Sequence, residues 1–259
     1  MQRSNDKKRA KISFVIPAHN EEQYLAHSLD SILEEIEKEN YGAEVIVVNN
    51  ASTDNTEGVV KEYPNVRLVV ENRKGTCFAR MAGFLASEGE LVANIDADTR
   101  IMPGWIKTAL EEFERKSNLV ALSGPCKYDL SPRFDFAAWI YYCALYAVYA
   151  VGHRLFGASS VILGGNFIAR RSALQAIGGY NTDMTFYGDD SDLAKRLAKV
   201  GIVKFSFRLM AHTSGRRFRV EGVVKTAGRY VLNYFWVIFF GKPFTRQAIH
   251  VRLKENRAA

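Results

Sequence analysis

The sequence contains few cysteines, and they form no pattern that would give them a shared structural role. Cys77, Cys126 and Cys143 are odd in number, lie far apart and belong to no CxxC or Cys/His motif. This spacing indicates neither a disulfide framework nor a zinc site. A reducing cytoplasm is therefore the expected compartment.

The N-terminus lacks the features of a secretion signal. "MQRSNDKKRAK" is polar and basic, and it has neither an apolar core nor a small-residue cleavage site. We expect a protein that is not secreted, with residues 1–10 as a basic tail.

Several motifs of nucleotide enzymes are missing. No GxGxxG follows the first apolar run, and no Walker A, HExxH or GxSxG sequence occurs. These absences argue against dinucleotide binding, P-loop chemistry, zinc proteolysis and serine hydrolysis.

The net charge of +7 is concentrated at the C-terminus. Residues 200–259 hold 12 Lys and Arg but only two Glu and no Asp, so the first 199 residues are slightly acidic. A basic segment suits anionic lipid, phosphate groups or nucleic acid. Because no zinc finger, RNP-type motif or heptad-linked basic region accompanies it, nucleic acid is not an expected partner.

The chain does contain a regular alternation of apolar runs and amphipathic segments, and 47% of its residues are hydrophobic. Alternating strands and helices predict an α/β fold with a mainly parallel sheet flanked by helices. The expected strands are Ile12–Ile16, Val45–Val48, 66–72, 91–95 and Val120–Cys126, and the expected helices are 22–39, 57–63, 77–89 and 105–116.

Polar residues follow three of these strands. They are Pro17–Glu21, Asn49–Asp54 and Asp96–Asp98. Ligands of parallel sheets bind beyond the carboxyl ends of the strands, so these segments predict a binding site. On an extended backbone Asp96 and Asp98 would face the same side and could hold a divalent cation against a diphosphate, although a solvated Asp-x-Asp turn is the simpler interpretation.

Positive charge could reach the same edge of the sheet. Lys74 lies in the loop "NRKGT", where an exposed lysine without a function is the alternative. His212 lies in "AHTSGRRFR" and is a candidate metal ligand or an ordinary loop histidine. Arginines 216, 217 and 219 in the same run could meet phosphate oxygens.

A second acidic cluster, "GDDSD", begins an amphipathic segment. Asp189, Asp190 and Asp192 would be stabilised at a helix N-terminus, but three carboxylates exceed what capping needs. The surplus predicts that one of them acts as a general base or reaches a metal.

Two aromatic stretches are candidates for a membrane surface. Residues 136–152 carry no charge but are short for a membrane span, and a buried core helix is an equally good interpretation. "RYVLNYFWVIFF", between Arg229 and Lys242, combines apolar side chains with flanking cations, and a helix folded back on the domain is its alternative.

Five blocks occur in an order that resembles the inverting family 2 glycosyltransferases of the GT-A fold. They are "FVIPAHNEE", "VIVVNNASTDNT", "ARMAGFLASEGELVANIDADT", "GGNFIARRSALQAIGGYN" and "GDDSDLAKRLAKVG". The likeness covers 11–207, which we expect to be the catalytic domain, with a basic helical extension over 208–259. It implies transfer of a sugar from a nucleotide-sugar donor, UDP-sugars first, to a glycan or lipid-linked acceptor with inversion.

The resemblance also implies roles for particular residues. Asp96-Ala97-Asp98 resembles the family's DxD, in which the second aspartate binds Mn²⁺ or Mg²⁺ and the first contacts the ribose or the metal shell. Pro17, Ala18, His19 and Glu21 match positions that touch the nucleotide. Asn50 stands where an aspartate is common, and its carbonyl could still accept a hydrogen bond from the base.

Asp190 matches the family's general base, with Asp189 as the second choice. The QxxRW signature of processive members is absent, which favours single additions. Two rival functions are a nucleotidyltransferase and a non-catalytic, membrane-associated nucleotide-sugar-binding protein. The expected location is the cytoplasm, with the inner membrane face as a possible docking surface.

Overall fold

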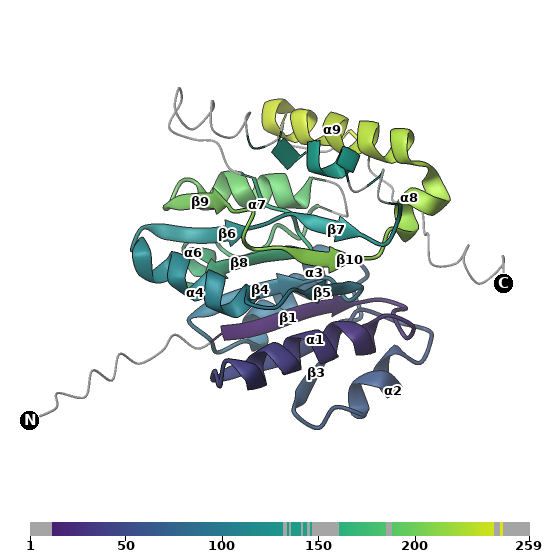
Figure 1. Ribbon diagram of the computed structural model, residues 1–259, viewed down its shortest axis with the longest axis vertical. Helices are drawn as coiled ribbons and strands as arrows, with labels where there is room; N and C mark the ends of the chain where they lie inside the picture. The colour runs from purple at the N-terminus through teal and green to yellow at the C-terminus, as the bar shows by residue number, and fades with distance from the viewer. Residues whose placement is uncertain are drawn as a thin grey trace, which may run out of the picture.

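The computed structural model describes residues 12–131, 134, 136–140, 142–143, 146, 161–184, 188–240 and 244–245, with backbone alone at 231, 234, 235 and 237–239. Figure 1 shows a layered α/β molecule with helices on both sides of a twisted sheet. The strands are β1 (Ile12–Ala18), β2 (Ala43–Asn49), β3 (Val66–Val70), β4 (Leu91–Ile95), β5 (Thr99–Ile101), β6 (Leu119–Ser123), β7 (Cys126–Tyr128), β8 (Asn166–Arg170), β9 (Ile202–Phe205) and β10 (Ala211–Thr213). The helices are α1 (Leu25–Lys38), α2 (Thr56–Lys61), α3 (Thr76–Ala86), α4 (Trp105–Arg115), α6 (Arg171–Ala176), α7 (Asp189–Leu197), α8 (Arg216–Glu221) and α9 (Val223–Phe240).

The main sheet has seven strands in the order β3-β2-β1-β4-β8-β6-β9. Strands β3, β2, β1 and β4 are parallel, whereas β8 runs antiparallel to β4 and β6. The prediction of a mainly parallel α/β sheet is confirmed. Because β8 is reversed, its first residue, Asn166, pairs with Ile95 at the carboxyl end of β4.

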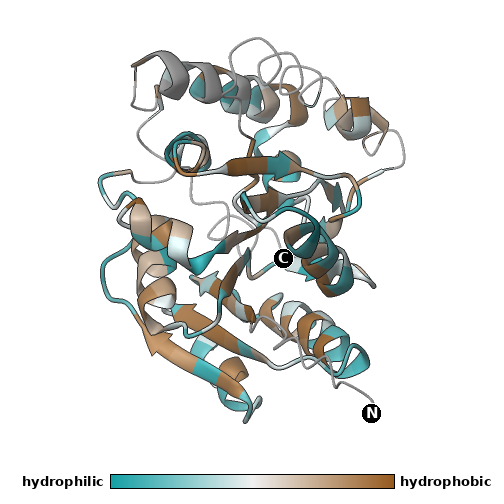
Figure 2. Cartoon of the chain, turned by 90° about the vertical axis from the view of Figure 1, so that its left-hand side faces the viewer, coloured by the Kyte–Doolittle hydropathy of each residue, from teal (hydrophilic) through white to brown (hydrophobic). Residues whose placement is uncertain are grey.

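Both faces of the main sheet are buried, which explains why its strands are mostly apolar. Ile12, Phe14 and Ile16 of β1 pack in one cluster with α1 and α4. Val15 points to the opposite face and joins a cluster with α3, α6 and α7. In Figure 2 much of the strand surface is accordingly brown, while hydrophilic residues colour many parts of the helices and loops.

A second, small sheet was not predicted. It has the order β5-β10-β7, with β10 antiparallel to β5 and parallel to β7. The single strand expected over Val120–Cys126 is wrong, because the chain breaks at Gly124-Pro125 into β6 and β7. A Cβ on Gly124 would lie 1.8 Å from the backbone oxygen of Leu209, so only glycine allows this close approach.

Residues beyond the expected domain boundary at 207 take part in this sheet. Leu209 and Ala211 are fully buried, and His212 and Thr213 pair with Arg100 and Thr99 of β5. The C-terminal segment is therefore tied directly to the turn that follows β4.

Buried Asn166 joins the two sheets and α4. Its Oδ1 accepts a hydrogen bond from the Trp105 indole (2.9 Å), and its Nδ2 donates to the Leu209 carbonyl (2.7 Å) and to those of Gly124 and Pro125. The four groups come from α4, the β6–β7 connection and the β9–β10 connection, so one side chain fixes how the two sheets meet.

Some expectations fall on residues outside the described ranges. These are the basic tail at 1–10, most of the second half of 136–152, and the residues after 245. Among the helices that the structure describes, none combines the length and apolar character needed to cross a membrane.

Candidate active site

The polar segments expected beyond the strands lie together at one edge of the main sheet. Ala18 ends β1, Asn49 ends β2, and Asp96 follows the last residue of β4. These three strands are adjacent and parallel, so the loops that carry the expected site residues meet at their carboxyl ends.

The loops after β1 and β2 are joined by hydrogen bonds. His19 Nδ1 lies 2.7 Å from the Asn50 carbonyl oxygen, and the Glu21 backbone N–H donates to Thr56 Oγ1 (2.8 Å). Asn20 and Ala51 have φ values of 55° and 53°, a left-handed conformation that turns each loop sharply. The first loop is therefore held in place by the second.

Asn50 uses its side chain to hold a third loop. Its Nδ2 donates to the carbonyls of Glu71 (2.9 Å) and Arg73 (2.7 Å), and its Oδ1 accepts from the Gly75 N–H (2.8 Å). Lys74 is exposed on this loop. An asparagine, unlike an aspartate, supplies the donor that the two carbonyls require.

Asp96 and Asp98 do not lie on an extended strand, so that prediction is wrong. β4 ends at Ile95, and residues 97–98 form a turn before β5 begins at Thr99. Asp96 is half-exposed, whereas Asp98 is largely buried. Ala97, between them, is buried in the core.

Asp98 and Glu21 share one buried arginine. Arg216 Nη2 lies 2.9 Å from Asp98 Oδ2 and 2.6 Å from Glu21 Oε1. The guanidinium also stacks over the Tyr24 ring at 4.8 Å. Burial lowers the pKa of Arg216, but the charges of Asp98 and Glu21 outweigh it and raise the pKa above its ordinary value, so the residue stays cationic.

Arg80 holds the other carboxylates. Its Nη1 lies 2.7 Å from Asp189 Oδ2 and 3.2 Å from Asp190 Oδ1, and its Nη2 lies 3.4 Å from Asp96 Oδ1. The Arg80 side chain is only 4% exposed. One guanidinium thus joins α3 to the beginning of α7 and to the residue after β4.

The two aspartates of "GDDSD" have different surroundings. The side chain of Asp189 is 12% exposed and that of Asp190 is 35% exposed. Burial and the neighbouring charge of Asp190 raise the pKa of Asp189 to about 7, although Arg80 acts in the opposite direction. Burial also raises the pKa of the adjacent Cys77 thiol, which keeps it protonated.

Two glycines separate the carboxylate groups. The Gly164 N–H donates to Asp190 Oδ2 (2.9 Å), and a Cβ on Gly164 would lie 2.2 Å from Asp190 Oδ1. A Cβ on Gly165 would lie 2.5 Å from Asp96 Oδ2. A side chain at Gly164 would displace Asp190, and one at Gly165 would displace Asp96. The two carboxylates therefore lie against this pair of glycines.

His212 is not brought together with Asp96 and Asp98. Its Nδ1 lies 2.9 Å from Arg100 Nη2, and its Nε2 lies 3.3 Å from Asp129 Oδ1. Side chains alternate along β10, so it is Thr213 whose hydroxyl reaches Asp98 Oδ1 (3.4 Å).

The chemistry of the site fits a divalent cation bound jointly with a substrate. Within the described part of the chain, no three His, Cys, Asp or Glu side chains are grouped to hold a metal. Mg²⁺ and similar hard cations usually bind one or two carboxylates together with substrate phosphates. Asp98 and Asp96 can provide the carboxylates. A site completed by His212 does not fit this geometry.

Sequence reasoning missed the roles of Arg80, Gly164 and Gly165. One signal was available, because Arg80 is the single charged residue in the helix sequence "TCFARMAGFLA", and a charge on such a segment is rarely buried without partners. Arg217 and Arg219 were grouped with Arg216, but they bond to Glu221 (3.0 Å) and to the Asp129 carbonyl (3.2 Å).

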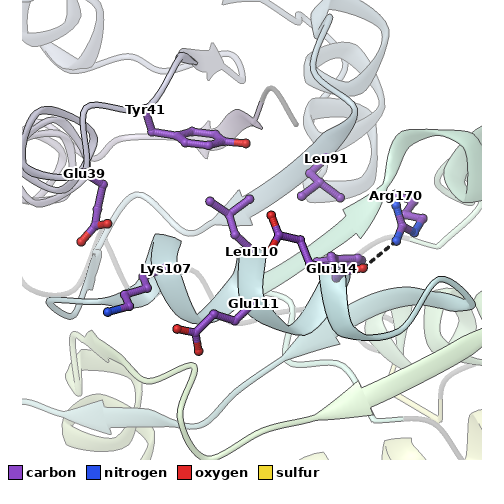
Figure 3. A pocket seen from close by; sticks show the side chains of 9 residues that line it. Glu39, Tyr41, Leu91, Lys107, Leu110, Glu111, Glu114 and Arg170 are labelled. Atoms are coloured by element: carbon purple, nitrogen blue, oxygen red, sulfur yellow. Dashed lines mark hydrogen bonds between the residues drawn. The ribbon is translucent and has the colours of Figure 1, made fainter. Parts of the chain in front are cut away.

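A hollow of about 360 Å³ lies at the opposite edge of the sheet (Figure 3). It is lined by Leu91, at the start of β4, and Arg170, which pairs with Leu91 at the end of β8. Arg170 donates to the Phe113 carbonyl (3.0 Å). None of the expected site residues lines it.

Comparison with known proteins gives a consistent result. The model of the family described as "Glycosyl transferase family 2" matches residues 13–178. A dolichyl-phosphate beta-glucosyltransferase, ALG5D of Trichomonas vaginalis, is 37% identical over 103 residues, which cover 36% of this chain and 32% of that protein. A poly-beta-1,6-N-acetyl-D-glucosamine synthase of Staphylococcus epidermidis is 29% identical over 180 residues, covering 67% of this chain and 42% of that protein.

The match thus spans less than half the length of either curated relative. Among solved structures, the mannosyltransferase PcManGT from Pyrobaculum calidifontis, in complex with GDP-Man and Mn²⁺, superposes with a TM-score of 0.68 at 22% identity. The likeness covers 92% of this chain and 66% of that one, and it shows the GT-A fold.

Replacing Arg80 with Gln should destabilise the fold in a pH-dependent way. Asp189, Asp190 and Asp96 would lose their common counter-charge, and breaking a buried pair costs about 3–5 kcal/mol. Arg80 lowers the pKa of Asp189, which stands at about 7 in its presence, so removing Arg80 should raise that pKa further. A folded-state pKa that is raised favours the folded protein at low pH, so the extra loss of stability appears as the pH rises above about 7.

Urea unfolding at about pH 5.5 and at about pH 8 measures this effect, with the larger loss expected at the higher pH. Arg115→Gln is the control, because its side chain is 64% exposed. It should change stability by less than about 0.5 kcal/mol. An Arg80→Gln variant whose loss is equal at both pH values would contradict the assigned role.

Proposed function

Because the chain belongs to glycosyl transferase family 2, we propose that it transfers one sugar from a nucleoside-diphosphate sugar to an acceptor hydroxyl with inversion at the anomeric carbon. One observation carries this proposal. Carboxylates at a single edge of the sheet form two groups, Glu21 with Asp98 on Arg216, and Asp189 with Asp190 on Arg80, which also contacts Asp96. In a single displacement the diphosphate leaves from one side of the sugar, while the acceptor hydroxyl loses its proton on the other side. One carboxylate group would serve each side.

The donor side is formed by the loops after β1, β2 and β4. Pro17, Ala18, His19 and Glu21 would contact the nucleotide, while Asn50 fixes the loop that carries Lys74 toward the diphosphate. Asp98, supported by Asp96, would hold Mn²⁺ or Mg²⁺, which when bound supplies positive charge to the diphosphate leaving group. The solved mannosyltransferase was obtained with GDP-Man and Mn²⁺, which supports this arrangement.

The acceptor side is formed by the start of α7. Asp190 is our choice for the general base, because it is more exposed than Asp189 and its two oxygens are oriented by Arg80 and by the Gly164 N–H. Asp189 lies deeper, against Arg80 and Cys77. Its role is to position Arg80, and through it Asp190.

The acceptor that we propose is lipid-linked, and the molecule would meet it at a membrane surface. The names of two curated relatives include a dolichyl-phosphate transferase and a polysaccharide synthase. Phe136, Trp139 and Ile140 are at least half exposed, as are Phe240 and Phe244 next to the basic C-terminal segment. Aromatic side chains beside cations suit the headgroup region, and flotation with anionic vesicles measures such binding.

A donor panel tests the proposed activity directly. UDP-sugars, the first choice, and GDP-sugars would be added with Mn²⁺ or Mg²⁺, and thermal unfolding recorded. A donor at a hundred times its dissociation constant should stabilise the protein by about 2.7 kcal/mol. Asp98→Ala should lose the metal-dependent part of this stabilisation, while Asp183→Ala, an exposed aspartate, should keep it. If Asp98→Ala binds the donor and metal normally, Asp98 is not the metal ligand.

Asp190→Asn should lower the turnover rate by about 10²- to 10⁴-fold with nearly unchanged donor affinity, because the lost group acts on the acceptor proton. Initial-rate kinetics with the donor selected above measure this, and Asp183→Asn is the matched control. Full turnover in Asp190→Asn together with loss in Asp189→Asn would transfer the role to Asp189.

A further inference from the structure

Arg216 contacts the aspartate that is proposed to bind the metal. Both of its carboxylate contacts use the same nitrogen, Nη2, which sits between Glu21 Oε1 and Asp98 Oδ2. The side chains of Arg216, Glu21 and Asp98 are 9%, 1% and 13% exposed, so little water screens the three charges. The oxygen that would bind a divalent cation is thus already ion-paired with an internal cation.

A guanidinium and a metal ion cannot share Asp98 Oδ2 at this distance without strong repulsion. We propose that Arg216 competes with the divalent metal for Asp98, and that a nucleoside diphosphate relieves the competition by accepting hydrogen bonds from Arg216. This inference rests on the proposed function, because it concerns the same donor site. It makes metal and nucleotide binding mutually dependent.

The geometry allows Arg216 to give up Asp98 without becoming unpaired. Glu21 stays within 2.6 Å of Nη2, so the buried guanidinium keeps one full counter-charge. A guanidinium has five N–H donors in a planar fork, and the hydrogen bond of Arg216 to Glu21 and its ion pair with Asp98 are both recorded at Nη2. These donors suit phosphate oxygens.

The position of Arg216 in the chain supports a small displacement. It is the first residue of the short helix α8, and Ser214, which follows β10, donates its N–H to the Asp98 carbonyl (3.2 Å). The backbone just before Arg216 is therefore tied to the Asp98 turn, and only the side chain must move. If Arg216 instead took the place of the metal altogether, nucleotide binding would not depend on a metal ion.

Electron paramagnetic resonance of free Mn²⁺ tests the proposal without reference to catalysis. Mn²⁺ would be titrated into the intact protein alone and with UDP or GDP. Arg216→Gln should bind Mn²⁺ at least about tenfold more tightly than the wild type in the absence of nucleotide, because the competing cation is gone. Nucleotide should tighten Mn²⁺ binding markedly in the wild type and much less in Arg216→Gln.

Arg217→Gln is the matched control. It removes the same charge from the next residue, whose guanidinium bonds to Glu221 rather than Asp98, and it should behave like the wild type. If Arg216→Gln does not fold, Glu21→Gln/Arg216→Gln removes the buried charge pair together, leaves Asp98 intact and should show the same tightening.

Unchanged or weaker Mn²⁺ binding in a folded Arg216 variant would overturn the proposal. So would wild-type nucleotide binding that is indifferent to EDTA, because Arg216 would then replace the metal. Failure of the wild type to bind any Mn²⁺–nucleotide pair would refute the proposed function instead, and the comparison with Mn²⁺ alone would still decide the competition.

Discussion

Neutralisation of crowded carboxylates is the constraint on which the site depends. Five acidic side chains gather at the carboxyl edge of the main sheet, and two buried arginines hold them there. Burial and, after it, the neighbouring charge of Asp190 raise the pKa of Asp189, and Arg80 acts against both. The five are Glu21, Asp96, Asp98, Asp189 and Asp190.

The two arginines also hold together elements of the fold that are far apart in the sequence. Arg80 joins α3 to α7 across 109 residues, and Arg216 reaches Glu21 across 195 residues. The small sheet places Arg216, because β10 pairs with β5 immediately after the Asp98 turn. Gly164-Gly165 lets Asp190 and Asp96, two of the carboxylates on Arg80, lie close against the same stretch of backbone.

Local pattern was sufficient for the parallel strands β1 to β4 and for the acidic candidates, because apolar runs and turn residues report on neighbours in the sequence. It was insufficient for the turn at Asp98, since pairing of β5 with β10 decides that conformation from over a hundred residues away. His212 looked like a metal ligand by residue type, but the register of β10 turns it toward Arg100 and Asp129. The partner of each arginine is likewise a long-range contact that no local motif encodes.

The central claim is that the charge on Asp98 and the base on Asp190 act from opposite sides of one sugar. The most direct measurement is the anomeric configuration of the sugar first released when the enzyme slowly hydrolyses its donor, followed by ¹H NMR before mutarotation. A single displacement by water activated at Asp190 predicts the inverted anomer. Release of the retained anomer would contradict the assignment of the two sides.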